Sequence, residues 1–177
     1  MLLKLISYLG LGLVLVKAEV LQIKNNGKED LVVSVTGEGD FVASPGNVNT
    51  LNVPNNFTGT ITAVPKHREG VKAPRTTVEL TLSPMGDAYD VSLLNGFNVK
   101  AKITPLKGRR CKPTGCSADV NSLCSPRNQA RDSEGKVVGC HDSPFLFKAV
   151  CPKAVVTTAD VRNVFTCTTN TYFITLG

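Results

Sequence analysis

Short alternating runs of apolar and polar residues dominate this chain of 177 residues. Alternation with a period of two puts successive side chains on opposite faces of a strand, and strands at roughly 8–12-residue intervals are typical of a β-sandwich or barrel. Turn residues fill the gaps, as in Asn25-Asn26-Gly27, Ser44-Pro45-Gly46 and Pro54-Asn55-Asn56. The predicted strands are Val20–Lys24, Leu31–Thr36, Asn49–Val53, Thr60–Val64, Thr76–Leu82, Tyr89–Leu93, Phe97–Ile103 and Tyr172–Leu176. Short helical turns are expected only at Ser117–Leu123 and Pro144–Val150.

The dipeptide Asn95-Gly96 lies between two of these runs and indicates a β-hairpin. A two-residue loop there would mix apolar and polar side chains on each face, so we prefer a three-residue loop, Leu94–Gly96. In that register Tyr89, Val91 and Leu93 face Ala101, Val99 and Phe97 on the buried side. Asp90 then lies opposite Lys100 on the outer face, where an ion pair is worth less than about 1 kcal/mol. In the preceding strand Glu79 also points outward, among threonines.

The first residues have the three parts of a secretory signal peptide. Lys4 supplies the positive region, Leu5–Val16 is uncharged, and Val16-Lys17-Ala18 offers a cleavage site. The apolar run is shorter than the roughly 20 residues that span a bilayer, although a retained signal anchor is the alternative. We therefore expect a signal peptide over residues 1–18 and a secreted, extracellular protein consisting of one domain over residues 19–177.

Charge and cysteine content agree with export. Loss of Lys4 and Lys17 with the signal would lower the net charge from +6 to +4, too little for the basic stripe of a nucleic-acid binder. Six cysteines all follow Arg110, and an even number in an oxidising compartment indicates disulfides, with 15 possible pairings. Asn56 heads a glycosylation sequon, Asn56-Phe57-Thr58.

Other candidate chemistry is sparse. His67 and His141 are isolated, and no phosphate loop, dinucleotide fingerprint or Ser/His/Asp arrangement is visible, so we expect no metal and no cofactor. The run Lys107–Arg110 is interpreted as a solvated loop that is able to contact acidic wall polymers.

Three segments in order resemble the thaumatin-like protein family. Tyr89–Val99 is similar to the family's central hairpin, and Gly115–Asn121 followed by Cys124 is similar to its next block. Cys151–Ala154, Asp160, Phe165–Cys167 and Tyr172–Ile174 resemble its C-terminal stretch. The resemblance runs from about Thr76 to the end of the chain, and residues before Thr76 fit only as a β-rich beginning.

The resemblance implies an all-β, thaumatin-like β-sandwich with a short disulfide-stapled loop region. It also implies the pairs Cys111–Cys167, Cys116–Cys151 and Cys124–Cys140. Full-length plant members have eight disulfides and a long cysteine-rich subdomain, whereas only ten residues separate Cys140 from Cys151 here. We therefore expect a reduced form in which one wall of the family's cleft is short or missing.

Family members have an acidic cleft made of an arginine, a glutamate and three aspartates. The resemblance implies that Glu79 is the glutamate and that Asp90 and Asp160 are the first and last aspartates. Asn95 stands in the place of the middle aspartate and is typical of a turn. Arg75 lies near the place of the arginine, at a shorter spacing from Glu79. The alternatives are a solvated strand face for Glu79 and a loop brace for Asp160, whose carboxylate would accept backbone hydrogen bonds.

The resemblance implies a protein that interacts with cell-wall polysaccharide, β-1,3-glucan, in defence, antifungal or wall-remodelling roles. One alternative is a weak endo-β-1,3-glucanase, a glycoside hydrolase with Glu79 and Asp90 as catalytic carboxyls. We favour binding over catalysis because exposed acids near Lys100 have no reason for a raised pKa. The chain lacks tryptophan, so stacking on sugars is weak and the expected affinity modest.

A second alternative is an inhibitor or protein-binding module that acts on secreted hydrolases. The expected partners are therefore cell-wall polysaccharide or secreted glycan-active proteins. We expect a monomer that binds no nucleic acid and does not insert stably into membranes.

Overall fold

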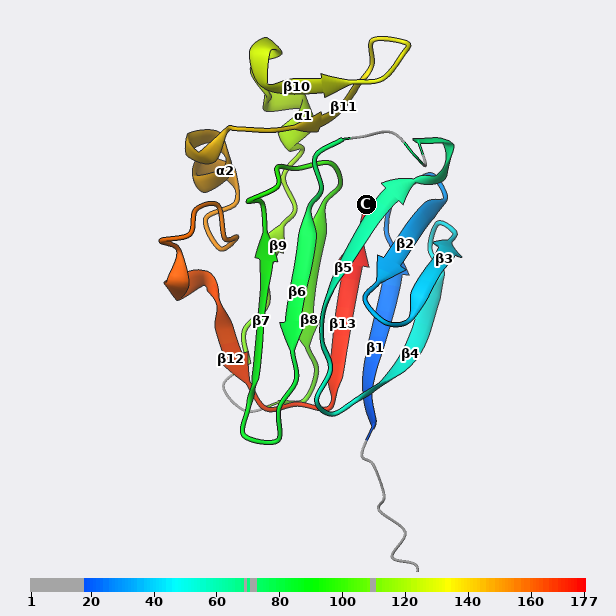
Figure 1. Cartoon of the computed structure of the whole chain (residues 1–177), viewed down its shortest axis with the longest axis vertical. Helices are drawn as coiled ribbons and strands as arrows, with labels where there is room; N and C mark the ends of the chain where they lie inside the picture. Colours follow the sequence, from blue (N-terminus) through cyan, green and yellow to red (C-terminus); the bar gives the residue numbers. More distant parts are fainter. Residues whose placement is uncertain (1–17, 69, 71–72, 109–110) are drawn as a thin grey trace, which may run out of the picture.

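The computed structural model describes residues 18–68, 70, 73–108 and 111–177, and Figure 1 shows their arrangement. The signal peptide predicted over residues 1–18 lies outside the described residues, except for Ala18, which begins the first strand. No helix in the described ranges is long and apolar enough to cross a bilayer.

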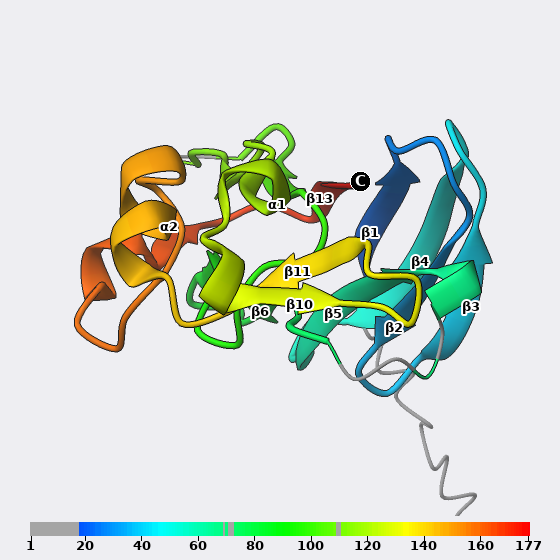
Figure 2. The same cartoon turned by 90° about the horizontal axis from the view of Figure 1, so that it is seen from above.

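Two β-sheets pack face to face (Figures 1 and 2). The first has the order β4-β1-β13-β8-β9, with β1 Ala18–Asn25, β4 Val48–Pro54, β8 Ala101–Pro105, β9 Thr114–Cys116 and β13 Thr171–Leu176. The second has the order β12-β7-β6-β5-β2-β3, with β2 Leu31–Val35, β3 Gly39–Ala43, β5 Thr58–Pro65, β6 Thr77–Thr81, β7 Asp87–Ser92 and β12 Phe165–Cys167. The first and last strands, β1 and β13, are parallel, whereas the other paired strands of both sheets are antiparallel.

The main core fills the space between the two sheets because alternate residues of each strand point inward. Ile23, Ile61, Val78, Val91 and Ile174 are fully buried there. At the lower end of this core the Tyr172 hydroxyl donates a hydrogen bond to Asp87 Oδ2 (2.6 Å), and the Tyr89 hydroxyl donates to the Lys112 carbonyl (2.7 Å). Each buried phenol therefore has a partner for its polar end.

A second, smaller core lies beyond one end of the sandwich. It contains α1 (Val120–Leu123), α2 (Pro144–Val150) and the hairpin of β10 (Gln129–Arg131) and β11 (Val137–Cys140), which Figure 1 shows across the top of the sheets. Three short 3-10 turns are Lys66–Arg68, Pro126–Asn128 and Val161–Asn163. Leu93, Phe97, Val120 and Phe147 form its apolar centre together with four half-cystines.

Three disulfides join Cys111 to Cys167, Cys116 to Cys151 and Cys124 to Cys140, the same pairs that the family resemblance implies. The first attaches the segment after β8 to β12 of the opposite sheet. The other two lie within the second core. The predicted all-β fold with a disulfide-stapled loop region is confirmed.

The predicted hairpin across Asn95-Gly96 is wrong. β7 and β8 belong to different sheets, and Phe97 instead pairs with Cys140 of β11 through an isolated bridge. The reason lies in Asn98, whose side chain is buried instead of facing outward. Its Oδ1 accepts from the Thr76 N–H (2.9 Å) and its Nδ2 donates to the Ala63 carbonyl (2.8 Å), so side-chain bonds replace a strand ladder at this point. The predicted pairing of Asp90 with Lys100 is therefore wrong as well.

Candidate functional site

Two carboxyl groups lie side by side on the outer face of the six-stranded sheet. Glu79 in β6 and Asp90 in β7 are directly opposite each other in the antiparallel register. Their neighbours in sequence, Leu80 and Val91, point into the core, so the alternation turns both acids outward. Residues directly opposite each other generally have Cβ atoms about 4.5–5.5 Å apart, and two ionised carboxylates at that separation repel each other.

Asp90 is buried despite its outward direction. Only 5% of the residue is exposed, and its buried Oδ1 atom has no hydrogen-bond partner among the described residues. Burial raises the pKa of Asp90, and the neighbouring Glu79 carboxylate raises it further, to about 7. The expectation that exposed strand acids near Lys100 have ordinary pKa values is thus wrong for Asp90, because its cross-strand neighbour is an acid and it is shielded from water.

Hydroxyl groups surround this acid pair. Thr60 of β5 is the other register partner of Glu79, and Thr77 of β6 is opposite Ser92 of β7. Because side chains alternate, these residues share the outer face with the two acids. The sequence shows threonine at every second position from Thr58 to Thr62 in β5 and on both sides of Glu79 in β6, but the register of these residues against Asp90 is visible only in the sheet.

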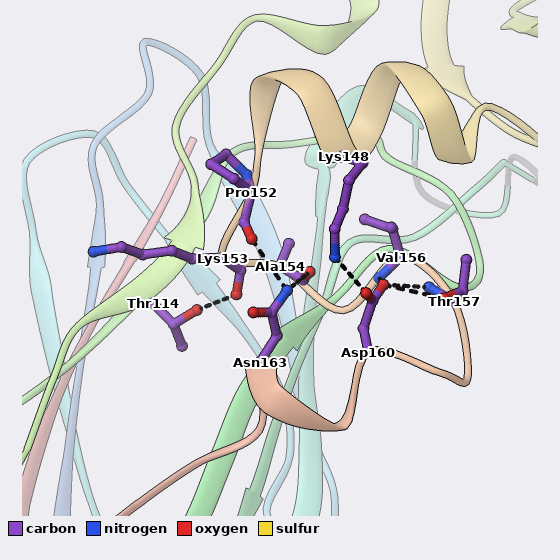
Figure 3. A network of polar contacts seen from close by, with 9 residues as sticks. All are labelled: Thr114, Lys148, Pro152, Lys153, Ala154, Val156, Thr157, Asp160 and Asn163. Carbon is purple, nitrogen blue, oxygen red and sulfur yellow. Dashed lines mark hydrogen bonds and ion pairs between the residues drawn. The ribbon is translucent and has the colours of Figure 1, made fainter.

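Asp160 lies in a loop beside the end of β7, where Val155 pairs with Ser92 in parallel. Figure 3 shows that its carboxylate closes this loop: Oδ2 accepts from the N–H groups of Val156 (3.0 Å) and Thr157 (2.9 Å), and Oδ1 contacts the Lys148 ammonium group of α2. The hydrogen bond from Lys148 and those from the loop lower the pKa of Asp160 to about 2. This arrangement agrees with the alternative interpretation of Asp160, in which its carboxylate stabilises a loop by accepting backbone hydrogen bonds. The contact with Lys148 could not be predicted from the sequence.

Arg75 precedes β6 and Asn95 follows β7, at the same end of the strand pair that carries Glu79 and Asp90. The Arg75 N–H donates to the Asn95 carbonyl (3.1 Å), and Asn95 is exposed in the turn after β7. Arg75 lines a small hollow of about 10 Å³ with Asn98 and Val138, and burial lowers its pKa. Asn95 precedes Gly96, whose positive φ of 85° completes the turn.

The remaining candidates lie elsewhere. In the described ranges no group of three or more His, Cys, Asp or Glu side chains is arranged to hold a metal ion. His67 contacts Glu29 (3.7 Å) and His141 contacts Asp142 (2.8 Å). Asn56 is exposed in the turn between β4 and β5, where a glycan would be accessible, and its glycosylation stays a prediction.

Comparison with known proteins supports the resemblance that the sequence segments indicate. Residues 65–145 match the Thaumatin family, and a "Thaumatin-like protein" of Arabidopsis thaliana is 33% identical over 135 residues, which are 60% of this chain and 56% of that protein. The chain is therefore similar to thaumatin-like proteins over these residues. "Pathogenesis-related protein 5" of Arabidopsis thaliana is 34% identical over 131 residues, covering 58% of this chain and 55% of that protein.

A shorter match concerns a relative with an enzymatic name. "Glucan endo-1,3-beta-glucosidase" of Prunus avium is 40% identical to this chain over 74 residues, 40% of this chain and 30% of that protein. The matched region thus spans little more than half of the curated relatives at most. Among solved structures, the protein elicitor MoHrip2 from Magnaporthe oryzae has a TM-score of 0.50 at 13% identity and covers 90% of this chain and 98% of that one, a likeness of fold alone.

Proposed function

We propose that this chain is a secreted, thaumatin-like protein that binds β-1,3-glucan in cell walls, in a defence, antifungal or wall-remodelling role. The observation that carries the proposal is the pairing of Glu79 with the buried carboxyl of Asp90 on a strand face rich in hydroxyl groups. At pH values below about 7 Asp90 is protonated, and the Glu79 carboxyl beside it is able to accept hydrogen bonds from sugar hydroxyls. Relatives named for pathogenesis and for β-1,3-glucan support the ligand class.

The hydroxyl groups beside the pair suit a neutral polysaccharide. Thr58, Thr60 and Thr81 are exposed on this face, and their hydroxyls both donate and accept hydrogen bonds, as sugar hydroxyls do, whereas Thr77 and Ser92 are buried. The face has no tryptophan to stack on a sugar ring, so the affinity expected for one chain of glucan is modest.

Sedimentation with insoluble β-1,3-glucan at low salt tests this proposal. The wild type is expected in the pellet, and a Glu79→Gln, Asp90→Asn double variant is expected mostly in the supernatant. A matched control, Glu38→Gln with Asp40→Asn, removes two exposed acids at the β3 edge of the same sheet and is expected to sediment like the wild type. Wild-type protein that stays in the supernatant, or equal sedimentation of all three proteins, would contradict the proposal.

Weak endo-β-1,3-glucanase activity is a second candidate, and the raised pKa of Asp90 specifically favours it. Glycoside hydrolysis needs one carboxyl that is protonated near neutral pH, which the environment of Asp90 favours, and a second carboxyl that is ionised. Asp90 would be the general acid and Glu79 the nucleophile or base. The direct cross-strand placement favours the short carboxyl separation of retaining enzymes, about 5–5.5 Å.

Release of reducing ends from laminarin tests the second candidate. Activity is expected to fall as the pH rises above about 7, since Asp90 loses its proton there, and Glu79→Gln is expected to remove at least about 99% of it. Equal rates for the wild type and Glu79→Gln would exclude hydrolysis while leaving the sedimentation result, and therefore glucan binding, unaffected.

A further inference from the structure

The opposite side of the molecule has two adjoining hollows lined by lysines. The first, of about 350 Å³, is lined by Lys28, Lys100 and Lys102, and the second, of about 170 Å³, by Lys102 and Lys153. Both include Lys102 and Ser117, so they form one continuous track along the end of the five-stranded sheet. Among the described residues, no Asp or Glu side chain lines either hollow.

The backbone fixes the positions of these lysines. Lys102 of β8 lies opposite Thr175 of β13 on one side and Gly115 of β9 on the other. Lys100 is two residues earlier and continues the same face, because the Gly177 N–H donates to its carbonyl (2.9 Å). A Cβ on Gly115 would meet the Lys102 Cα atom at 2.6 Å, so this glycine is what allows β9 to lie so close beside Lys102.

The two outer lysines are held by hydrogen bonds from neighbouring segments. Lys28 lies in the turn after β1, which the fully buried Asn25 organises: its Nδ2 donates to the carbonyls of Glu29 and Ala43 (2.7 Å each). The Lys153 carbonyl accepts from Thr114 Oγ1 of β9 (2.7 Å), and Figure 3 shows its ammonium group extending away from Asp160.

The positive charges of the track are not neutralised by the protein. None of its four lysines makes an ion pair with a residue in the described ranges. Glu29, which follows Lys28 in sequence, lies 3.7 Å from His67 instead. Four like charges around recessed surfaces concentrate a positive potential that attracts anions.

The lining favours a hydrated anionic polymer over a lipid surface. Beside the lysines it offers the hydroxyls of Ser117 and Thr175 and the amide of Asn26, and its apolar side chains are only Ala101 and Pro113. Binding to a bilayer surface requires protruding basic residues and apolar side chains that insert among the lipids, whereas these lysines line hollows. A polymer that repeats its charge at each unit is able to occupy both hollows at once.

We propose that this lysine track binds a carboxylate-bearing polysaccharide. Glu79 and Asp90 lie on the outer face of the other sheet, so the track is separate from the proposed glucan site and does not depend on it. A molecule with both sites is able to hold a neutral and an acidic wall polymer at the same time.

Binding of the whole secreted protein to polygalacturonate tests the proposal. The wild type is expected to bind at low ionic strength and to bind more weakly as salt screens the lysines. A Lys28→Gln, Lys100→Gln, Lys102→Gln variant is expected to bind at least about tenfold more weakly. The control Lys66→Gln, Arg127→Gln, Lys136→Gln changes the net charge equally at exposed basic residues outside the track, and less than about a threefold loss is expected.

Three results would overturn the proposal. The first is a wild type that does not bind polygalacturonate, and the second is an equal loss in both triple variants, which would mean that net charge alone is responsible. The third is binding to phosphatidylserine vesicles that depends on Lys28, Lys100 and Lys102 while polygalacturonate binding does not. Sedimentation with neutral β-1,3-glucan is expected to be unchanged in both triple variants, which separates the test of the lysine track from the test of the glucan site. Equal melting temperatures of the variants and the wild type exclude misfolding.

Discussion

Asp90 makes the stability of the protein depend on pH. Its pKa is about 7 in the folded protein and near 3.8 when it is exposed, so the folded state holds the proton more tightly. Between these two values the stability contributed by protonated Asp90 falls as the pH rises, and above about 7 the loss is complete. A shift of this size corresponds to a few kcal/mol at most.

Replacing Asp90 by asparagine removes this titration while keeping the shape of the side chain. Asp90→Asn is therefore expected to be more stable than the wild type at pH 8, by about 1–3 kcal/mol, with a smaller difference at pH 5. Urea unfolding at the two pH values measures the change in free energy. The exposed control Asp40→Asn is expected to show no such trend, and parallel pH profiles for the wild type and Asp90→Asn would contradict the burial of this carboxyl.

Asp160 has the opposite dependence. Its pKa is lowered to about 2, so the stability that its bonds contribute is present above the unfolded value of about 3.8 and is lost as the pH falls toward 2. Asp160→Asn is expected to destabilise the protein by about 1–2 kcal/mol at pH 7 and by much less near pH 2.5. Thermal unfolding at both pH values is the measurement. A loss that is independent of pH would mean that the loop does not need the charge.

At the level of the elements, the predicted strands with clear alternation are present, with their boundaries shifted by a few residues at most. The sequence did not predict β3, nor the short β9–β12, because strands of three to five residues with mixed patterns carry little periodicity. Phe97–Ile103 was predicted as one strand, yet only Ala101–Pro105 forms one. Alternation does not reveal that Asn98 finds its partners on β5 and before β6, since those contacts join residues far apart in the chain.

The same limit applies to the candidate site. Alternation predicted that Glu79 and Asp90 point outward, but the register that makes them direct neighbours comes from the sheet. The burial of Asp90 and the contact of Asp160 with Lys148 depend on packing between segments. The lysine track could not be predicted either, because its lysines come from a turn, a strand and a loop separated by long stretches of chain.

The turn after β7 depends on Gly96. This residue has a φ of 85°, and a Cβ there would meet the Cys140 carbonyl oxygen at 2.5 Å and the Pro74 Cβ at 2.6 Å. Gly96→Ala is expected to cost about 2–4 kcal/mol of stability, because strain and a clash with backbone add together. Gly37→Ala, at a similar φ of 79° with open space around it, is the control and is expected to cost only about 1 kcal/mol. Chemical denaturation compares the two, and equal losses would show that the contact with β11 has no effect.

At the level of the whole molecule, two apolar cores share one chain. The main core contains one half-cystine, Cys167, with its partner Cys111 packed against it, whereas four half-cystines take part in the second core. The Cys111–Cys167 bridge, with a sequence separation of 56, links the segment after β8 to the opposite sheet. In the chain-entropy model this bridge stabilises by about 4 kcal/mol, and the Cys124–Cys140 bridge, with a separation of 16, by about 3 kcal/mol.

Removal of the two bridges of the second core is expected to unfold that core locally. A variant with alanine at Cys116, Cys151, Cys124 and Cys140 is expected to lose hydrogen-exchange protection in α1, α2 and β11, while β1, β6 and β13 stay protected. A variant without Cys111 and Cys167 is the comparison and is expected to lower the global stability instead. Equal loss of protection throughout the first variant would show that the two cores unfold as one unit.

The parallel pairing of β1 with β13 has a consequence for biosynthesis. β1 finds β4 soon after both are made, but its other edge stays unpaired until Thr171–Leu176 leave the ribosome. During translation that bare edge is able to recruit a wrong strand, from the same nascent chain or from another. The edge of β1 is therefore open to aggregation until β13 is in place. A chain that stops before β13 is expected to be insoluble instead of forming a shortened native protein.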